Sequence, residues 1–140
     1  MVAEVAPNLV VVLVSAVISF IIGMLWYSPV LFGNVWIKLE KRSTKDMKQA
    51  KASGMTWRLV CAFIGAFITA YVAAHFVAYV AAVTFMQGMQ LGFWLWLGFA
   101  APLQFGIVLW NNKPVKLFFI NTLQVLVNLM IVNGILAVWK

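Results

Sequence analysis

The stretch NLVVVLVSAVISFIIGMLWYSPVL, residues 8–31, decides the structural class of this chain. It carries no charge and is longer than the roughly 20 residues that an α-helix needs to cross a bilayer. Three more apolar stretches follow, and together they predict helices at about 8–37, 57–85, 91–110 and 115–139. Helices are expected because backbone polar groups must be satisfied within each span. We therefore predict an all-α polytopic membrane protein, with residues 1–140 forming a single four-helix transmembrane domain.

Composition leads to the same class. The chain is 65% hydrophobic and 9% charged, with a mean hydropathy of +1.01, whereas soluble domains carry about 25% charged residues. The formal net charge of +7 then indicates orientation and contact with anionic lipids, and nucleic acid is not an expected partner. Cys61 is the single cysteine, so an internal disulfide framework and a cysteine-based zinc site are excluded. The N-terminal residues lack the positive charge of a signal peptide, so the first apolar stretch is expected to be a retained helix.

The distribution of lysine and arginine predicts the orientation. Residues 38–58 hold seven of these side chains, and Lys113 and Lys116 lie between the third and fourth stretches, while residues 86–90 hold none. By the positive-inside rule the basic loop at 38–56 faces the cytoplasm of a cell-membrane protein, with both termini outside. Within this loop, Ser43 followed by Asp46 predicts the start of a short surface helix that ends at Gly54. Six tryptophans are expected near the two membrane surfaces, namely Trp36, Trp57 and Trp110 on the basic side and Trp94, Trp96 and Trp139 on the other.

A short phrase, Pro-x-x-Phe-Gly followed by a tryptophan, occurs twice. Its residues are Pro29, Phe32, Gly33 and Trp36, and then Pro102, Phe105, Gly106 and Trp110. A proline within a helix removes a hydrogen bond and bends the helix, and the tryptophan would anchor the helix end at the headgroups. The phrase therefore predicts matching kinks in two parallel-repeat hairpins, related by an axis along the membrane normal. A coincidence of composition is the alternative.

The same residues carry a resemblance to a known family. The segments LWYSPVLFGNVW (25–36) and WLGFAAPLQFGIVLWNNKPVKLFFIN (96–121) resemble the two signatures of the domain of unknown function 1761 family. The resemblance spans essentially the whole chain and implies a small integral membrane protein without an established activity. Two positions depart from the pattern: Asn111 stands where members often have a glutamate, and Val115 where they often have an aromatic residue.

Small residues at four-residue spacing predict close helix packing. One strip lies on the second helix and another on the first, and their members are Ala66, Ala70, Ala74 and Ala78, and Ser15, Ser19 and Gly23. The strips either pack against each other within the chain or form a contact in a homo-oligomer.

Polar side chains within the spans are candidates for a polar interior. Asn121, Gln124 and Asn128 share one helix face, and Gln104 could meet them. Tyr71, His75 and Tyr79 form a second group, in which His75 either relays protons or is a neutral, hydrogen-bonded side chain.

No nucleophile–base pair, intramembrane carboxylate or metal-ligand cluster is present in the sequence, so neither an enzyme nor a cofactor or metal site is expected. Two function classes remain. The one that the sequence favours is a structural or accessory membrane subunit that packs by helix–helix contacts, working as a homo-oligomer or in a larger complex. The other is a small oligomeric channel or transporter lined by Gln104, Asn121, Gln124 and Asn128. A polar cavity would favour transport, and a dry interior would favour the accessory role.

Overall fold

The computed structural model describes residues 4–140, and this part of the chain is entirely helical apart from its turns. The elements are α1 (Leu9–Trp26), α2 (Gly33–Leu39), α3 (Thr44–Ala52), α4 (Met55–Tyr79), α5 (Phe85–Leu95), the π-helical segment η1 (Trp96–Ala100), α6 (Ala101–Asn111) and α7 (Val115–Val138). Four helical segments are long and apolar enough to cross a membrane: α1, α4, the continuous helix from α5 to α6, and α7. The predicted class, an all-α chain with four candidate membrane helices, is confirmed.

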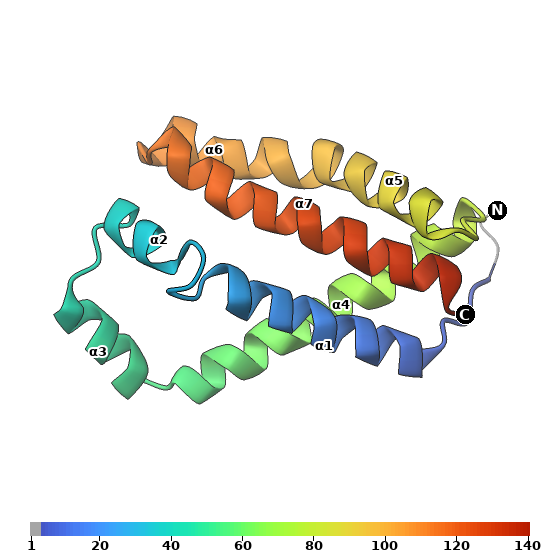
Figure 1. Cartoon of the computed structure of the whole chain (residues 1–140), viewed down its shortest axis with the longest axis horizontal. Coiled ribbons are helices and arrows are strands. Elements are labelled where there is room, and N and C mark those ends of the chain that lie inside the picture. Colours follow the sequence, from blue (N-terminus) through green and yellow to red (C-terminus); the bar gives the residue numbers. More distant parts are fainter. Residues whose placement is uncertain (1–3) are drawn as a thin grey trace.

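Helix α7 is the centre of the bundle. It packs against α1, α4, α5 and α6, and Figure 1 shows it between α1 and the α5–α6 helix, with α4 crossing behind α1. The short helices α2 and α3 lie at the end away from the C-terminus (Figure 1). The buried core lies in the other half of the bundle, where α1, α4 and α7 contribute mainly valine, leucine and alanine, including Val12, Ala70 and Val132.

The first predicted helix, 8–37, is wrong as a single element. Helix α1 ends at Trp26, and α2 begins at Gly33 after a tight turn. Pro29 therefore breaks the helix rather than bending it. The turn satisfies its own backbone groups: Phe32 N–H donates to the Trp26 carbonyl at 3.0 Å, and Gly33 N–H donates to the Ser28 carbonyl at 2.9 Å. Such internal satisfaction is what a break near the hydrocarbon requires.

The third predicted helix, 91–110, begins too late. The residues expected to form a link at 86–90 are helical because a capping box starts α5 at Phe85. The Thr84 hydroxyl accepts from Gln87 N–H at 3.2 Å, and the side-chain Oε1 of Gln87 accepts from Thr84 N–H at 3.2 Å. The second span correspondingly ends at Tyr79 instead of residue 85. Because of this shift, Trp94 and Trp96 lie near the middle of their helix and not at its end.

Pro102 also lacks a backbone N–H to donate, but here the helix accommodates the missing hydrogen bond in a different way. The helix widens to a π-turn over Trp96–Ala100 and then continues as α6, so it is not interrupted. A π-bulge is one of the known ways in which a helix accommodates a proline or an extra residue. The two copies of the phrase thus have different backbone conformations. The helix is interrupted by a turn at Pro29, and it continues through a π-bulge before Pro102.

The helix packing also lacks the predicted twofold relation. Such an axis would exchange α1 with the α5–α6 helix and α4 with α7, so contact between α1 and α7 would require an equal contact between α5 and α4. Helix α1 does pack on α7, but α4 and α5 touch at most marginally. Phe32 packs on Trp26 and Phe105 on Phe118, with ring centroids 4.7 Å and 5.2 Å apart. The phrases therefore do not occupy equivalent surroundings in this fold.

The closest helix contact joins α5 to α7, and glycines make it possible. A Cβ on Gly92 would lie 2.5 Å from the Leu129 carbonyl oxygen, and one on Gly88 would overlap the Asn133 carbonyl. From the other side, a Cβ on Gly134 would lie 2.6 Å from the Phe85 ring. Gly88 and Gly92 are four residues apart, which is the spacing of the small-residue motif that lets membrane helices approach closely. This motif was hidden in the sequence by the assignment of 86–90 to a link.

The predicted surface helix of the basic loop is confirmed. Ser43 caps α3: its hydroxyl accepts from Asp46 N–H at 3.1 Å, and the Asp46 carboxylate accepts from Ser43 N–H at 2.9 Å. Helix α3 ends at Ala52, just before Gly54, which has a positive φ of 100°. The capping box therefore fixes the residue at which this helix starts.

The hydrogen bonds from Ser43, first from its backbone and then involving its side chain, lower the pKa of Asp46. A lowered folded-state pKa means that the charged carboxylate stabilises α3 at neutral pH, and that this stabilisation is lost as the pH falls through that lowered pKa. In an NMR titration we expect the Asp46 carboxyl to titrate at a lower pH in wild type than in Ser43→Ala. Ser53→Ala, at the other end of α3, is the matched control and should leave the titration unchanged. Equal midpoints in wild type and Ser43→Ala would mean that the Ser43 hydroxyl does not contribute, since alanine keeps the backbone N–H that bonds Asp46.

Candidate functional site

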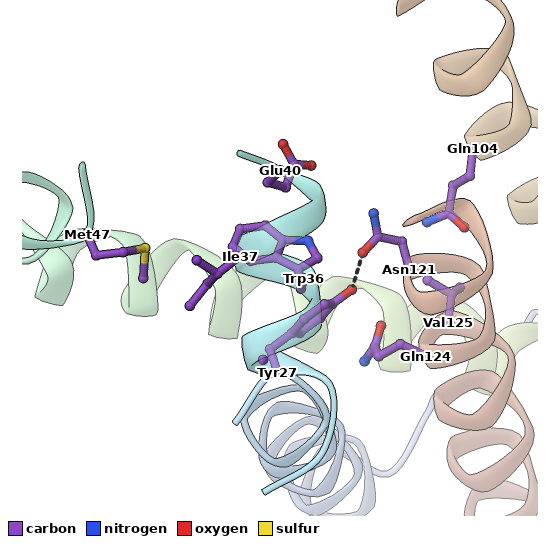
Figure 2. A pocket seen from close by; sticks show the side chains of 10 residues that line it. Tyr27, Trp36, Ile37, Glu40, Met47, Gln104, Asn121, Gln124 and Val125 are labelled. Atoms are coloured by element: carbon purple, nitrogen blue, oxygen red, sulfur yellow. Dashed lines mark hydrogen bonds between the residues drawn. The ribbon is translucent and has the colours of Figure 1, made fainter. Parts of the chain in front are cut away.

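A cleft of about 490 Å³ lies between α2 on one side and α6 and α7 on the other. Three of the predicted amide side chains line it, Gln104 from α6 and Asn121 and Gln124 from α7. Figure 2 shows these amides facing Tyr27, Trp36 and Glu40 across the cleft. Val125 and Ile37 add apolar surface. The cleft is therefore amphipathic, with amides on one wall and mainly aromatic and apolar side chains on the other.

Two indole N–H groups hold the segment of α7 that presents Asn121. Trp26, the last residue of α1, donates to the Ile120 carbonyl at 2.9 Å. Trp96, in the π-helical segment, donates to the Thr122 carbonyl at 2.8 Å and to the Thr122 hydroxyl at 3.0 Å. Because these donors come from two different elements, the backbone on both sides of Asn121 is fixed. Such support from outside a site is what keeps its functional side chains in place.

Tyr27 links the two walls of the cleft. Its hydroxyl donates to the Asn121 side-chain oxygen at 2.8 Å (Figure 2). This bond leaves the amide N–H₂ of Asn121 available as a donor. Tyr27 is held in place as the C-cap of α1, where its N–H still donates to the Gly23 carbonyl at 3.2 Å. The break at Pro29 then allows α2 to place Trp36 beside it.

Glu40 and Lys113 form an ion pair at the rim, with Nζ and Oε2 3.0 Å apart. The pair joins the end of α2 to the turn between α6 and α7, so the basic loop and the second basic turn lie at the same end of the bundle. Both side chains keep part of their surface in solvent, and the pair is expected to contribute little to stability. In the cleft, the negative charge of Glu40 is therefore balanced by the positive charge of Lys113.

Buried polar atoms without a partner lie at and beyond the cleft. Among residues 4–140, the side-chain oxygens of Gln104, Asn128, Asn133 and Ser15 are buried and accept no hydrogen bond. Most buried polar atoms in proteins are paired, and an unpaired one calls for an explanation such as a functional role or a bound molecule. Gln104 is the unpaired residue that lines the cleft, but its oxygen is itself buried, and in Figure 2 the amide nitrogen is the atom turned toward Asn121. Asn128, expected in the same lining, does not line it.

Tyr71, His75 and Tyr79, the second predicted polar group, lie apart from this cleft on α4. They stack along α4, with ring centroids of Tyr71 and His75 4.9 Å apart and those of His75 and Tyr79 6.2 Å apart. Both tyrosines are exposed on the bundle, and His75 Nδ1 lies 2.9 Å from the Tyr71 carbonyl within the same helix. Helix α4 is apolar on all sides, so its sequence does not indicate which face the bundle covers.

Most residues of the two small-residue strips pack between helices of the bundle. Ser15, Ser19 and Ala70 are buried, Ala74 packs against the core, and Gly23 lies beside Gln124. Ala66 is half-buried and Ala78 is exposed. The strips therefore serve contacts within this chain over most of their length.

Sequence reasoning missed the aromatic wall of Tyr27 and Trp36, and Glu40, as parts of the cleft. The signal that could have found them is the Ser-Pro pair at 28–29, which ends the first helix and allows α2 to fold back. It also missed Asn133, which is fully buried beside Gly88 and donates to the Leu129 carbonyl at 2.8 Å. In the described residues no three histidine, cysteine, aspartate or glutamate side chains gather as a metal site would require.

Four apolar helices, with a polar cleft at the end that carries the basic segments, define a multi-pass membrane protein. Its family is that described as protein of unknown function (DUF1761), to which the chain belongs: the family's sequence pattern matches residues 10–137. This match confirms the resemblance seen in the two signature segments. No curated protein and no solved structure matches the chain.

Proposed function

We propose that the protein is a non-catalytic membrane protein that binds a small polar solute in the amide cleft, as a small channel or transporter does. The observation that carries the proposal is the convergence of Gln104, Asn121 and Gln124 on one cleft. Its volume of about 490 Å³ falls within the range of about 300–1,000 Å³ typical of small-molecule sites. Amides that face a cavity rather than one another are available to a ligand.

The buried core in the other half of the bundle supports a cleft that opens at one end only. The buried core contributes Val132 and Leu136 from α7, beyond the last α7 residue of the cleft, Val125. Seven residues of helix separate Val125 from Val132, which corresponds to roughly 10 Å along the axis. The core therefore closes the bundle beyond the cleft. A transporter that alternates between two open sides has such a closed half in each conformation.

The orientation proposed here places the basic end, and with it the cleft, at the cytoplasmic face beside anionic lipids. Its support is the concentration of lysine and arginine on α2, α3 and the turn at Lys113. In a Cys61→Ala background, Lys45→Cys should resist an impermeant thiol reagent in intact cells and react once the membrane is opened. Labelling of this exposed position from outside would reverse the orientation.

The structural or accessory role stays as a second candidate because of the outward face of α4. Tyr71 and Tyr79 are exposed there, with His75 between them, and polar side chains in a span usually face protein or water. A second copy or another membrane subunit would cover them. This candidate predicts a stable complex and no solute dependence.

A binding screen decides between the two candidates. The protein is purified in an amine-oxide detergent, and saturation-transfer NMR tests one member of each of four classes: glucose, glycine, acetate and tetramethylammonium. Binding of any class to wild type, at least about tenfold weaker in Gln104→Leu, supports the solute site. Vesicles containing wild type should then take up that solute faster than vesicles containing the variant.

Gln90→Leu is the matched control, since Gln90 is an exposed glutamine on the same long helix. Removing the unpaired Gln104 oxygen should not unfold the protein, because an unsatisfied buried polar atom is itself unfavourable. If no class binds, or if the two variants bind equally, the solute site is refuted and the accessory role is favoured.

A further inference from the structure

The amides of the cleft offer a ligand both donors and acceptors of hydrogen bonds. Each primary amide offers two N–H donors and one carbonyl acceptor, and the cleft has three of them, Gln104, Asn121 and Gln124. One acceptor, the oxygen of Asn121, is occupied by Tyr27. Another, the oxygen of Gln104, is buried, so the acceptor that remains for a ligand is the oxygen of Gln124. A ligand that fits must therefore donate as well as accept.

The charge of the cleft is close to neutral. Glu40 is the one ionisable acid among the lining residues, and Lys113 neutralises it at 3.0 Å. An anion would find no unpaired cation among the lining residues, and a cation would have to compete with Lys113 for Glu40. Charged ligands would lose hydration without gaining an opposite charge, which is unfavourable. This argues for an uncharged ligand.

The α2 wall adds a surface for carbon skeletons. Trp36 lines the cleft, and its ring is held by Arg42, 5.6 Å from the ring centroid, and by the edge of Tyr27 at 5.9 Å. Ile37 and Val125 extend the apolar surface. A held indole opposite a row of amides suits a molecule with C–H groups on one face and hydroxyl groups around its edge (Figure 2).

From these three features we infer that the cleft takes a neutral polyhydroxyl group, either a free sugar or polyol or the sugar headgroup of a lipid. The inference rests on the proposed function, in which the cleft is a binding site, and adds the chemical class of the ligand. A hydroxyl donates to the Gln124 oxygen and accepts from the amide N–H groups of Gln104 and Asn121. The ring or chain carbons lie against Trp36.

The test compares sugar binding with binding of other classes in the same protein. Saturation-transfer NMR is measured with glucose and with sorbitol, in an amine-oxide detergent because a sugar detergent would compete. A second arm places the protein in phosphatidylcholine nanodiscs with and without diglucosyl diacylglycerol and measures the retained lipid by native mass spectrometry. Variants are Gln104→Leu and Trp36→Leu, with Gln90→Leu and the exposed Trp94→Leu as matched controls.

We expect glucose or sorbitol to bind wild type and both controls, and to bind Gln104→Leu and Trp36→Leu at least about tenfold more weakly. Retention of the glycolipid alone, with the same dependence on Gln104 and Trp36, supports the same chemistry and assigns its source to a headgroup. Binding of glycine, acetate or tetramethylammonium at Gln104 without any sugar binding overturns the polyhydroxyl assignment but leaves the solute site intact. Absence of all binding overturns both.

Discussion

Gly92→Ala is expected to destabilise the folded protein by about 1–3 kcal/mol. The added Cβ would lie 2.5 Å from the Leu129 carbonyl oxygen and 2.8 Å from Met130 Cα, and both are backbone atoms of α7. A flexible side chain could move away, but a helix backbone moves only if the whole contact between α5 and α7 opens. Unfolding in mixed micelles with increasing SDS, followed by tryptophan fluorescence, measures the loss.

Gly88→Ala should behave in the same way, since its Cβ would overlap the Asn133 carbonyl group. Gly65→Ala is the control, because no atom lies within 4 Å of the Cβ that it would add. The control should unfold at the same SDS fraction as wild type. If all three variants unfold together with wild type, the close approach of α5 to α7 is not a feature of the folded protein.

The four membrane helices could be predicted because hydropathy over some 20 residues depends on the bilayer and hardly on the tertiary structure. Their ends were harder to place. The start of α5 depends on a capping box between Thr84 and Gln87, and glycine and glutamine at 86–90 resemble a loop by composition. The capping pattern was a local signal that outweighed composition.

The amide wall of the cleft was foreseeable and the opposite wall was not. Asn121 and Gln124 are three residues apart, so they share a helix face in any α-helix. Trp36 faces them, beside Tyr27, only because the helix ends before Pro29 and α2 folds back over α7. A proline in an apolar stretch permits a bend, a π-bulge or a break, and this chain uses a break at Pro29 and a π-bulge before Pro102. Which outcome occurs depends on contacts with helices distant in sequence.

The alanine strip of α4 illustrates the same limit. Its spacing indicated a close contact but did not indicate the partner, and the structure divides the strip: Ala70 is 1% exposed in the core, while Ala62 and Ala78 are exposed. One sequence pattern thus contains both a buried position and open ones. This division allows the same substitution to be made in two environments on one helix.

Ala70→Leu is the second change expected to have a large effect. Ala70 lies in the buried cluster with Val11, Val12 and Val132, where α1, α4 and α7 meet. A leucine there adds three carbon atoms to a filled space, which should destabilise the fold by about 1–3 kcal/mol and occasionally more. The same SDS titration, together with light scattering for the size of the protein in detergent, measures the change.

Ala62→Leu and Ala78→Leu make the same addition on exposed parts of α4, so neither should lower stability by a comparable amount. Their effect on size is informative in its own right. A shift to smaller particles in Ala62→Leu or Ala78→Leu, with stability retained, would mean that a second copy packs against the open part of the strip. If Ala70→Leu instead matches wild type in both stability and size, the junction of α1, α4 and α7 is loosely packed. The buried core could then no longer be taken as the closed half of the bundle beyond the cleft.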